Sequence, residues 1–116
     1  MKTVYDLNKQ IDDLSKKRGD IFYSLRCTDY EIEQIDYAIK LLYYVKYIIQ
    51  ANELSKAKTI INDRRNRTIE YIAKITSQPL CIQRTSFNMR LIDILTSDLS
   101  GLNWILELDE FDRMVH

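Results

Sequence analysis

The sequence has very little glycine or proline. Two glycines and one proline occur in 116 residues, whereas globular proteins use about 7% glycine and about 5% proline. Tight hairpins and short strands depend on these residues for their turns. Their scarcity disfavours a β-rich fold and favours helices joined by short connections.

Histidine and cysteine are also scarce. The one histidine, His116, is the last residue, and the two cysteines, Cys27 and Cys81, do not have the spacing of metal ligands. The sequence therefore offers few residues from which a Ser–His or Cys–His nucleophilic pair could form. It also contains no Gly-rich phosphate-loop motif. We expect no catalytic residue, no metal site, no cofactor and no small-molecule substrate. The chain is predicted not to be an enzyme.

A net charge and a long hydrophobic run are both missing. Seventeen basic and seventeen acidic residues give a formal net charge of zero, so no overall field attracts nucleic acid or a membrane. The longest apolar-rich stretch, residues 39–49, is broken by Lys40 and Lys46, and no signal-peptide pattern occurs. We therefore predict an intracellular, cytoplasmic protein. Frequent Ile, Lys, Asn and Tyr is typical of an AT-rich genome such as that of a phage or virus, whose product would work in the host cytoplasm.

What the sequence does contain is helical periodicity, most clearly near the N-terminus, where apolar residues recur every three or four positions and form a seam along one face of a helix. Arg18 occupies one position of this seam, and two interpretations of it stay open. A charged seam residue can specify register or oligomeric state, or its long stem can carry the charge to the bundle edge. The spacing of three and four predicts a coiled-coil-like helix that packs on a following helix or on a second copy; its apolar positions are Val4, Leu7, Ile11, Leu14, Ile21 and Leu25.

A second helix is predicted to begin near Asp29, because Thr28 and Glu31 have the spacing of a capping box. It is apolar around much of its circumference, which is typical of a central helix. Residues 52–55 are predicted to form a turn, with Ser55 as the cap of a third helix, although one continuous rod is the alternative.

The C-terminal third contains the chain's only proline, Pro79, which is expected to end the third helix. We predict an extended segment at 80–82. A short helix is expected over Phe87–Thr96, with Ser86 as its cap. A break at Ser100–Gly101 and a last helix from Leu102 to about Met114 would then follow.

Together these patterns predict an all-α fold within a single domain, 1–116. Residues 1–76 would form an antiparallel helical hairpin or a three-helix bundle with a coiled-coil-like N-terminal helix. Residues 80–116 would add a short C-terminal helical cap.

Aromatic residues are the best candidates for a protein-binding surface. The sequence holds eight tyrosines, among them Tyr43, Tyr44 and Tyr47 close together. Tyrosine and tryptophan combine apolar area with a polar tip and are favoured at interfaces. We predict that these tyrosines, Trp104, Phe111 and the seam residue Arg18 contact a partner. The alternatives are that the hydroxyl groups sit at the core margin and that Trp104 closes the bundle.

The third helix offers a different candidate. Residues 56–74 contain six basic and two acidic residues, a net charge of +4. Lys58, Arg64, Arg65 and Arg67 could contact the phosphates of a nucleic acid. The alternative is that they pair with acids of the same protein or of a second subunit, since residues 93–113 contain six acids and one arginine.

The sequence thus predicts a non-enzymatic helical module for protein–protein interaction. It would act as a small viral or phage regulator, inhibitor or assembly factor, and its partner could be a second copy in a homodimer. Nucleic-acid binding through the basic third helix is the second hypothesis. No membrane contact is expected.

Overall fold

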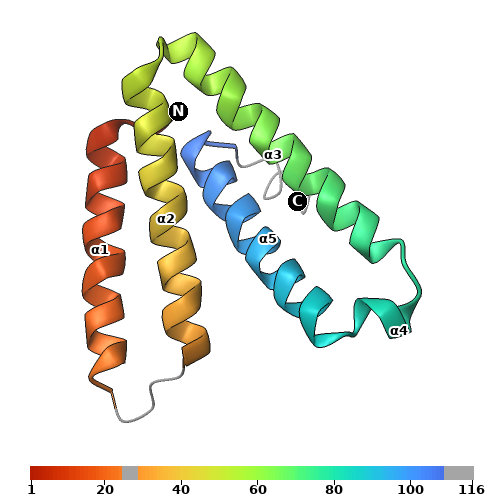
Figure 1. Cartoon of the computed structure of the whole chain (residues 1–116). Coiled ribbons are helices and arrows are strands. Elements are labelled where there is room, and N and C mark those ends of the chain that lie inside the picture. Colours follow the sequence, from red (N-terminus) through yellow and green to blue (C-terminus); the bar gives the residue numbers. More distant parts are fainter. Residues whose placement is uncertain (25–28, 109–116) are drawn as a thin grey trace, which may run out of the picture.

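The computed structural model describes residues 1–24 and 29–108, and these residues fold into five helices (Figure 1). No strand occurs within the described ranges. The predicted all-α fold class is therefore confirmed. The helices are α1 (Val4–Phe22), α2 (Asp29–Ala51), α3 (Leu54–Thr76), α4 (Leu80–Gln83) and α5 (Ser86–Ile105).

The predicted N-terminal seam forms α1 and packs on the next helix of the same chain. A capping box begins α1: the Thr3 hydroxyl accepts from the backbone N–H of Asp6 at 3.2 Å, and the Asp6 carboxylate accepts from the Thr3 N–H at 3.0 Å. Leu7 and Ile11 are buried against the core. The last predicted seam residue, Leu25, lies outside the described residues, as does Thr28 of the capping box predicted for the second helix.

Helix α2 is the central helix, as its wide apolar arc predicts. It packs against α1, α3 and α5. The predicted start near Asp29 and the predicted turn after α2 are both confirmed, because α2 ends at Ala51 and α3 begins at Leu54. Ser55 does not cap α3, however: Glu53 is the N-cap residue and makes no side-chain cap hydrogen bond.

The segment after Pro79 is helical, so the prediction of an extended segment at 80–82 is wrong. The Pro79 carbonyl accepts from the N–H groups of Ile82 and Gln83 at 2.9 and 3.0 Å, and these bonds start the single turn α4. Proline biases the residue before it away from helical geometry, but it leaves the residues after it free to turn.

Helix α5 runs unbroken through Ser100–Gly101, so the two predicted short helices are one helix of 20 residues. Its cap is Thr85 rather than Ser86, because the Thr85 hydroxyl accepts from the backbone of Asn88. Gly101 serves a close helix contact instead of a break: a Cβ there would lie 2.8 Å from Cδ2 of Leu41 on α2. The helix ends at Ile105, well before Met114, and residues beyond 108 lie outside the described part.

The helices form two antiparallel pairs, α1 with α2 and α3 with α5, which diverge from a common end (Figure 1). The core lies where the pairs meet, because it is built from the first half of α1, the second half of α2, the start of α3 and the end of α5. Within the described residues, no helix has the length and apolar character needed to cross a membrane. The main core residues are Leu7, Ile11, Leu41, Leu42, Val45, Ile48, Ala57, Ile61, Leu102, Ile105 and Leu106.

Candidate functional site

A groove runs between α2 and α3, with α5 as its floor. It consists of two adjoining hollows of about 370 and 220 Å³ that share Tyr44 and Arg64. We call this surface the α2–α3 groove. Its lining residues are Tyr37, Lys40, Leu41 and Tyr44 from α2, Ile60, Asp63, Arg64 and Arg67 from α3, and Ile94 and Asp98 from α5.

Arg64 is the central residue of the α2–α3 groove. Its guanidinium carbon lies 4.6 Å from the centre of the Tyr44 ring, a distance at which the cation is attracted to the ring face. Its Nη2 lies 3.5 Å from Oδ2 of Asp98. A single side chain therefore connects α3 to both α2 and α5. These two contacts fix the orientation of the Arg64 guanidinium.

Asp98 is the acid that receives Arg64. Its side chain is 16% exposed, and this burial raises the pKa of its carboxyl group, while the nearby Arg64 charge acts in the opposite direction. The raised pKa means that desolvation outweighs the attraction of the arginine. The ion pair therefore orients Arg64 without being a strong source of stability.

The four basic residues of the nucleic-acid hypothesis do not face one way. Arg64 is directed to Asp98, and Arg65 donates from Nε to Oδ1 of Asn103 at 2.5 Å. Both acceptors belong to α5. Arg67 and Lys58 are exposed, and of these two only Arg67 lines the α2–α3 groove. Of the three arginines predicted as phosphate contacts, two are thus paired with α5 and the third, Arg67, is exposed.

The three tyrosines proposed for protein binding all lie on the accessible side of α2. Tyr43, Tyr44 and Tyr47 are 54%, 37% and 68% exposed. Their spacing of three and four residues places Tyr47 beside both of the others on the helix surface. Tyr44 belongs to the α2–α3 groove itself, and Tyr47 continues the same ridge by one turn. The structure therefore brings Tyr44, from the tyrosine hypothesis, together with Arg64 and Arg67, from the arginine hypothesis, in one groove.

Arg18 forms an ion pair between α1 and α2. Its Nε and Nη2 lie 2.6 and 3.5 Å from the two carboxylate oxygens of Asp36, which is a bidentate geometry. The two side chains are 40% and 41% exposed. The guanidinium thus reaches the margin of the hairpin, in agreement with the interpretation that the long stem carries the charge to the bundle edge. Phe111, the remaining aromatic candidate, lies outside the described residues.

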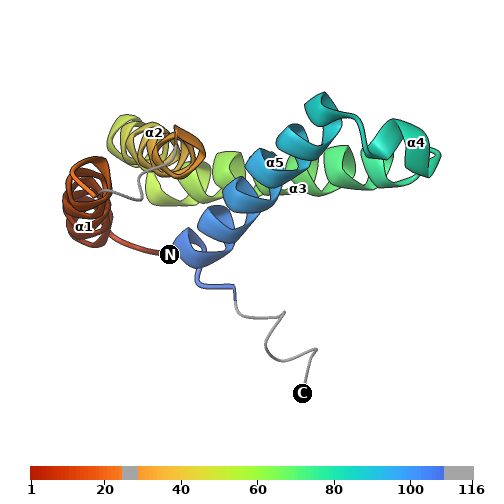
Figure 2. The same cartoon turned by 90° about the horizontal axis from the view of Figure 1, so that it is seen from below.

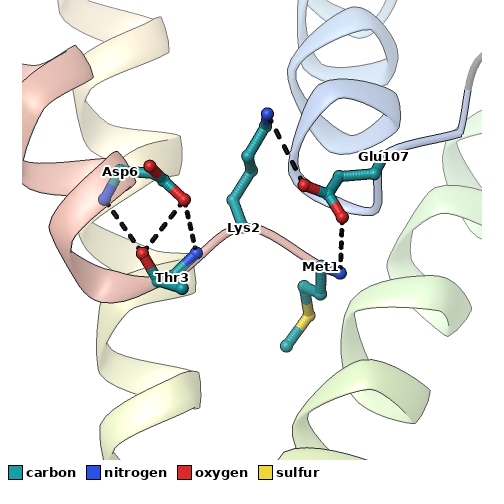
Figure 3. Close-up of polar contacts among 5 residues, drawn as sticks. All are labelled: Met1, Lys2, Thr3, Asp6 and Glu107. Carbon is teal, nitrogen blue, oxygen red and sulfur yellow. Dashed lines mark hydrogen bonds and ion pairs between the residues drawn. The ribbon is translucent and has the colours of Figure 1, made fainter.

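Trp104 lies in the last full turn of α5, away from the α2–α3 groove, and is 37% exposed. Lys2 covers it, with Nζ 5.0 Å from the ring centre. Figure 3 shows the neighbouring contacts: the N-terminal ammonium lies 3.0 Å from Oε2 of Glu107, and Lys2 Nζ lies 3.6 Å from Oε1. Glu107 has a φ of 57°, an uncommon conformation for a residue other than glycine. Residues 1–3 therefore tie the start of α1 to the end of α5.

Asp98 and Lys40 were not predicted as members of this surface. In the sequence, Asp98 is one of six acids in a charged segment, and Lys40 is a break in an apolar run. A sharper signal was present, since Asp98 follows Ile94 by four residues and precedes Leu102 by four, on the packed face of α5. An acid at such a position needs a partner from another helix.

Metal binding finds no support in the part of the chain that the structure describes. No group of three or more His, Cys, Asp or Glu side chains there is arranged to hold an ion.

No protein-family model, curated protein or solved structure matches the chain. The α2–α3 groove must therefore be interpreted from its own chemistry.

Proposed function

We propose that this chain is a protein-binding module and that the α2–α3 groove, with Tyr43 and Tyr47 beside it, is its contact surface. The observation that carries the proposal is Arg64, held between Tyr44 and Asp98 in an open groove. Tyrosine and arginine are among the residues that are enriched in binding hot spots. Side chains that are already oriented lose less conformational entropy when a partner binds.

The mixed charge of the groove favours a protein over a nucleic acid. Asp63 and Asp98 line it together with Lys40, Arg64 and Arg67. A polyanion would bring phosphates close to the two carboxylates, which disfavours binding electrostatically. A protein partner can present both signs of charge, and Lys40 and Arg67 form no ion pair within the described residues. These two cations are available to acidic side chains of a partner.

The proposal includes the compartment, role, origin and partner that the sequence predicted. The module would act in the cytoplasm as a small regulator, inhibitor or assembly factor, with a viral or phage origin in keeping with its composition. A second copy of the chain is one candidate partner. The exposed Cys81 is a free thiol, which a reducing compartment would preserve.

The test is a capture experiment with matched tyrosine variants. Wild-type chain, Tyr47→Ala, Arg67→Ala and the control Tyr5→Ala would be immobilised and exposed to a lysate of the source cells. Tyr5 is 75% exposed on α1 and lies outside the groove. We expect a specific partner to be retained by wild type and Tyr5→Ala. Its affinity should fall roughly 30-fold for Tyr47→Ala if that residue is a hot spot worth about 2 kcal/mol.

Two results would contradict the proposal. One is a partner that binds all four chains equally, which would place the contact elsewhere. The other is a chain that captures no protein and stays monomeric in light scattering at high concentration. A labelled oligonucleotide, titrated at low salt, examines the nucleic-acid alternative: affinity that falls with salt and is lost in Lys58→Ala/Arg67→Ala would favour it.

A further inference from the structure

A second groove lies between α1 and α5 and has a different chemical character. Its volume is about 460 Å³, within the range of roughly 300 to 1,000 Å³ that small-molecule sites occupy. Helix α2 forms its floor through Ala38, Leu41 and Leu42, while Leu14 of α1 and Trp104 of α5 form its apolar walls. We call this surface the α1–α5 groove. It shares only Leu41 with the α2–α3 groove.

The polar groups of the α1–α5 groove are few and uncharged. Three hydroxyl groups, from Thr96, Ser97 and Ser100, lie along the α5 wall, and the amide of Gln10 comes from α1. No lining residue has an ionisable acid or base. The nearest charge, the Lys2 ammonium over Trp104, already pairs with Glu107. A charged ligand would therefore lose hydration in the groove without gaining an unpaired counter-charge, which is costly. An apolar ligand with a hydroxyl, carbonyl or amide could instead form hydrogen bonds with the α5 wall.

The N-terminal segment lies near the Trp104 end of the α1–α5 groove. Residues 1–3 cross from the start of α1 to the end of α5 (Figure 2). The N–H of Lys2 donates to the carbonyl of Ile105 at 2.7 Å. The Glu107 carboxylate forms ion pairs with both the N-terminal ammonium and the Lys2 ammonium (Figure 3). Lys2 also covers Trp104, which forms this end of the wall. A partner helix running along the groove would meet this crossing segment, whereas a small molecule would not.

From these three features we propose that the α1–α5 groove binds an uncharged, mainly apolar small molecule that carries one hydrogen-bonding group. This inference does not rest on the protein-binding proposal. The sequence predicted no small-molecule substrate. Because the lining residues of the groove include no acid or base for catalysis, the molecule that it binds would be a ligand and not a substrate. The ligand's apolar part lies against α2, and its polar group faces the hydroxyls of α5.

Trp104 makes the inference directly measurable, because it is the only tryptophan of the chain and lines the groove. Octan-1-ol is a suitable probe, with octanoate and octylammonium as charged analogues of the same chain length. We expect octan-1-ol to shift Trp104 emission to shorter wavelength in a saturable way as it displaces water from the ring. Both charged analogues should bind at least tenfold more weakly.

Variants show whether the signal comes from this groove. Ala38→Phe fills the floor and should abolish the response to octan-1-ol, whereas Ala73→Phe, at an exposed position of α3, should retain it. Ser97→Leu offers a second way to fill the groove if Ala38→Phe does not fold. The proposal is overturned by no saturable shift up to the solubility limit of octan-1-ol, by equal binding of octanoate, or by an unchanged response in a folded groove-filling variant.

Discussion

Gly101 of α5 lies against Leu41 of α2 with no space between them for a side chain. A Cβ on Gly101 would come within 2.8 Å of Leu41 Cδ2, and Leu41 is itself 4% exposed. The same leucine lines both grooves. This contact therefore sets how closely α5 approaches α2, and with it the depth of the α1–α5 groove and the position of Asp98 beneath Arg64.

Replacing each glycine by alanine tests this relationship. Alanine in a helix is favoured over glycine by about 1 kcal/mol, and no atom lies within 4 Å of a Cβ built at Gly19. We expect Gly19→Ala to raise the free energy of unfolding by up to about 1 kcal/mol. Gly101→Ala should lower it by on the order of 1 kcal/mol, because overpacking against Leu41 exceeds the helix gain. Urea unfolding of both variants provides the comparison, and equal stabilisation would contradict the contact.

Asp98 predicts a pH dependence of stability at acidic pH. Burial raises its pKa above 3.8 in the folded chain. Between 3.8 and the folded pKa, the folded chain holds more protons than the unfolded chain, so this residue's contribution to stability falls as pH rises through that window. Asp98→Asn cannot titrate. Denaturation of both chains across this window should therefore show wild type losing stability relative to the variant as pH rises, and a constant difference would contradict the raised pKa.

Glu107 predicts the opposite dependence. The hydrogen bond from the N-terminal ammonium lowers the pKa of Glu107 below 4.5. Its contribution to stability is therefore present above 4.5 and is lost as pH falls through the folded pKa. We expect the difference in free energy of unfolding between wild type and Glu107→Gln to shrink as the pH falls below 4.5. Acetylating the N-terminus removes the ammonium charge and should reduce this difference at neutral pH, whereas no effect of acetylation would contradict the ion pair.

The Arg18–Asp36 pair distinguishes the two interpretations of the seam arginine. Both side chains are about two-fifths exposed, so a double-mutant cycle should give a coupling of about 0.2 to 1 kcal/mol that weakens with salt. Arg18→Ala should leave the oligomeric state unchanged, because the arginine is engaged within its own chain. A change of oligomeric state in light scattering would instead support a role in specifying a partner.

Patterns within short stretches of the sequence predicted the parts of the fold that those stretches determine by themselves. The seam of α1, the central place of α2 and the turn after Ala51 follow from apolar periodicity and from a short stretch of chain. The continuity of α5 did not, because the role of Gly101 depends on Leu41, sixty residues away in the sequence. A glycine that allows close packing and one that ends a helix look alike until the facing helix is known.

The candidate site was predicted in pieces. Tyr44 and Arg64 were both selected, but for different partners, because nothing in their local sequence places one over the other. Their contact depends on how α2 and α3 diverge after the turn, and Asp98 joins them only through the packing of α5. The crossing segment at Lys2 and Glu107 gave no local signal, since its contacts join the two ends of the described chain.

Site-specific photo-crosslinking tests the protein-binding proposal most directly. A benzophenone amino acid would replace Tyr47 in one chain and Tyr5 in another, and both chains would be irradiated in the source cells. The proposal predicts a defined crosslinked protein from position 47 that is absent from position 5 and disappears in an Arg67→Ala background. Crosslinking from position 5 alone, or from neither position, would contradict the α2–α3 groove as the contact surface.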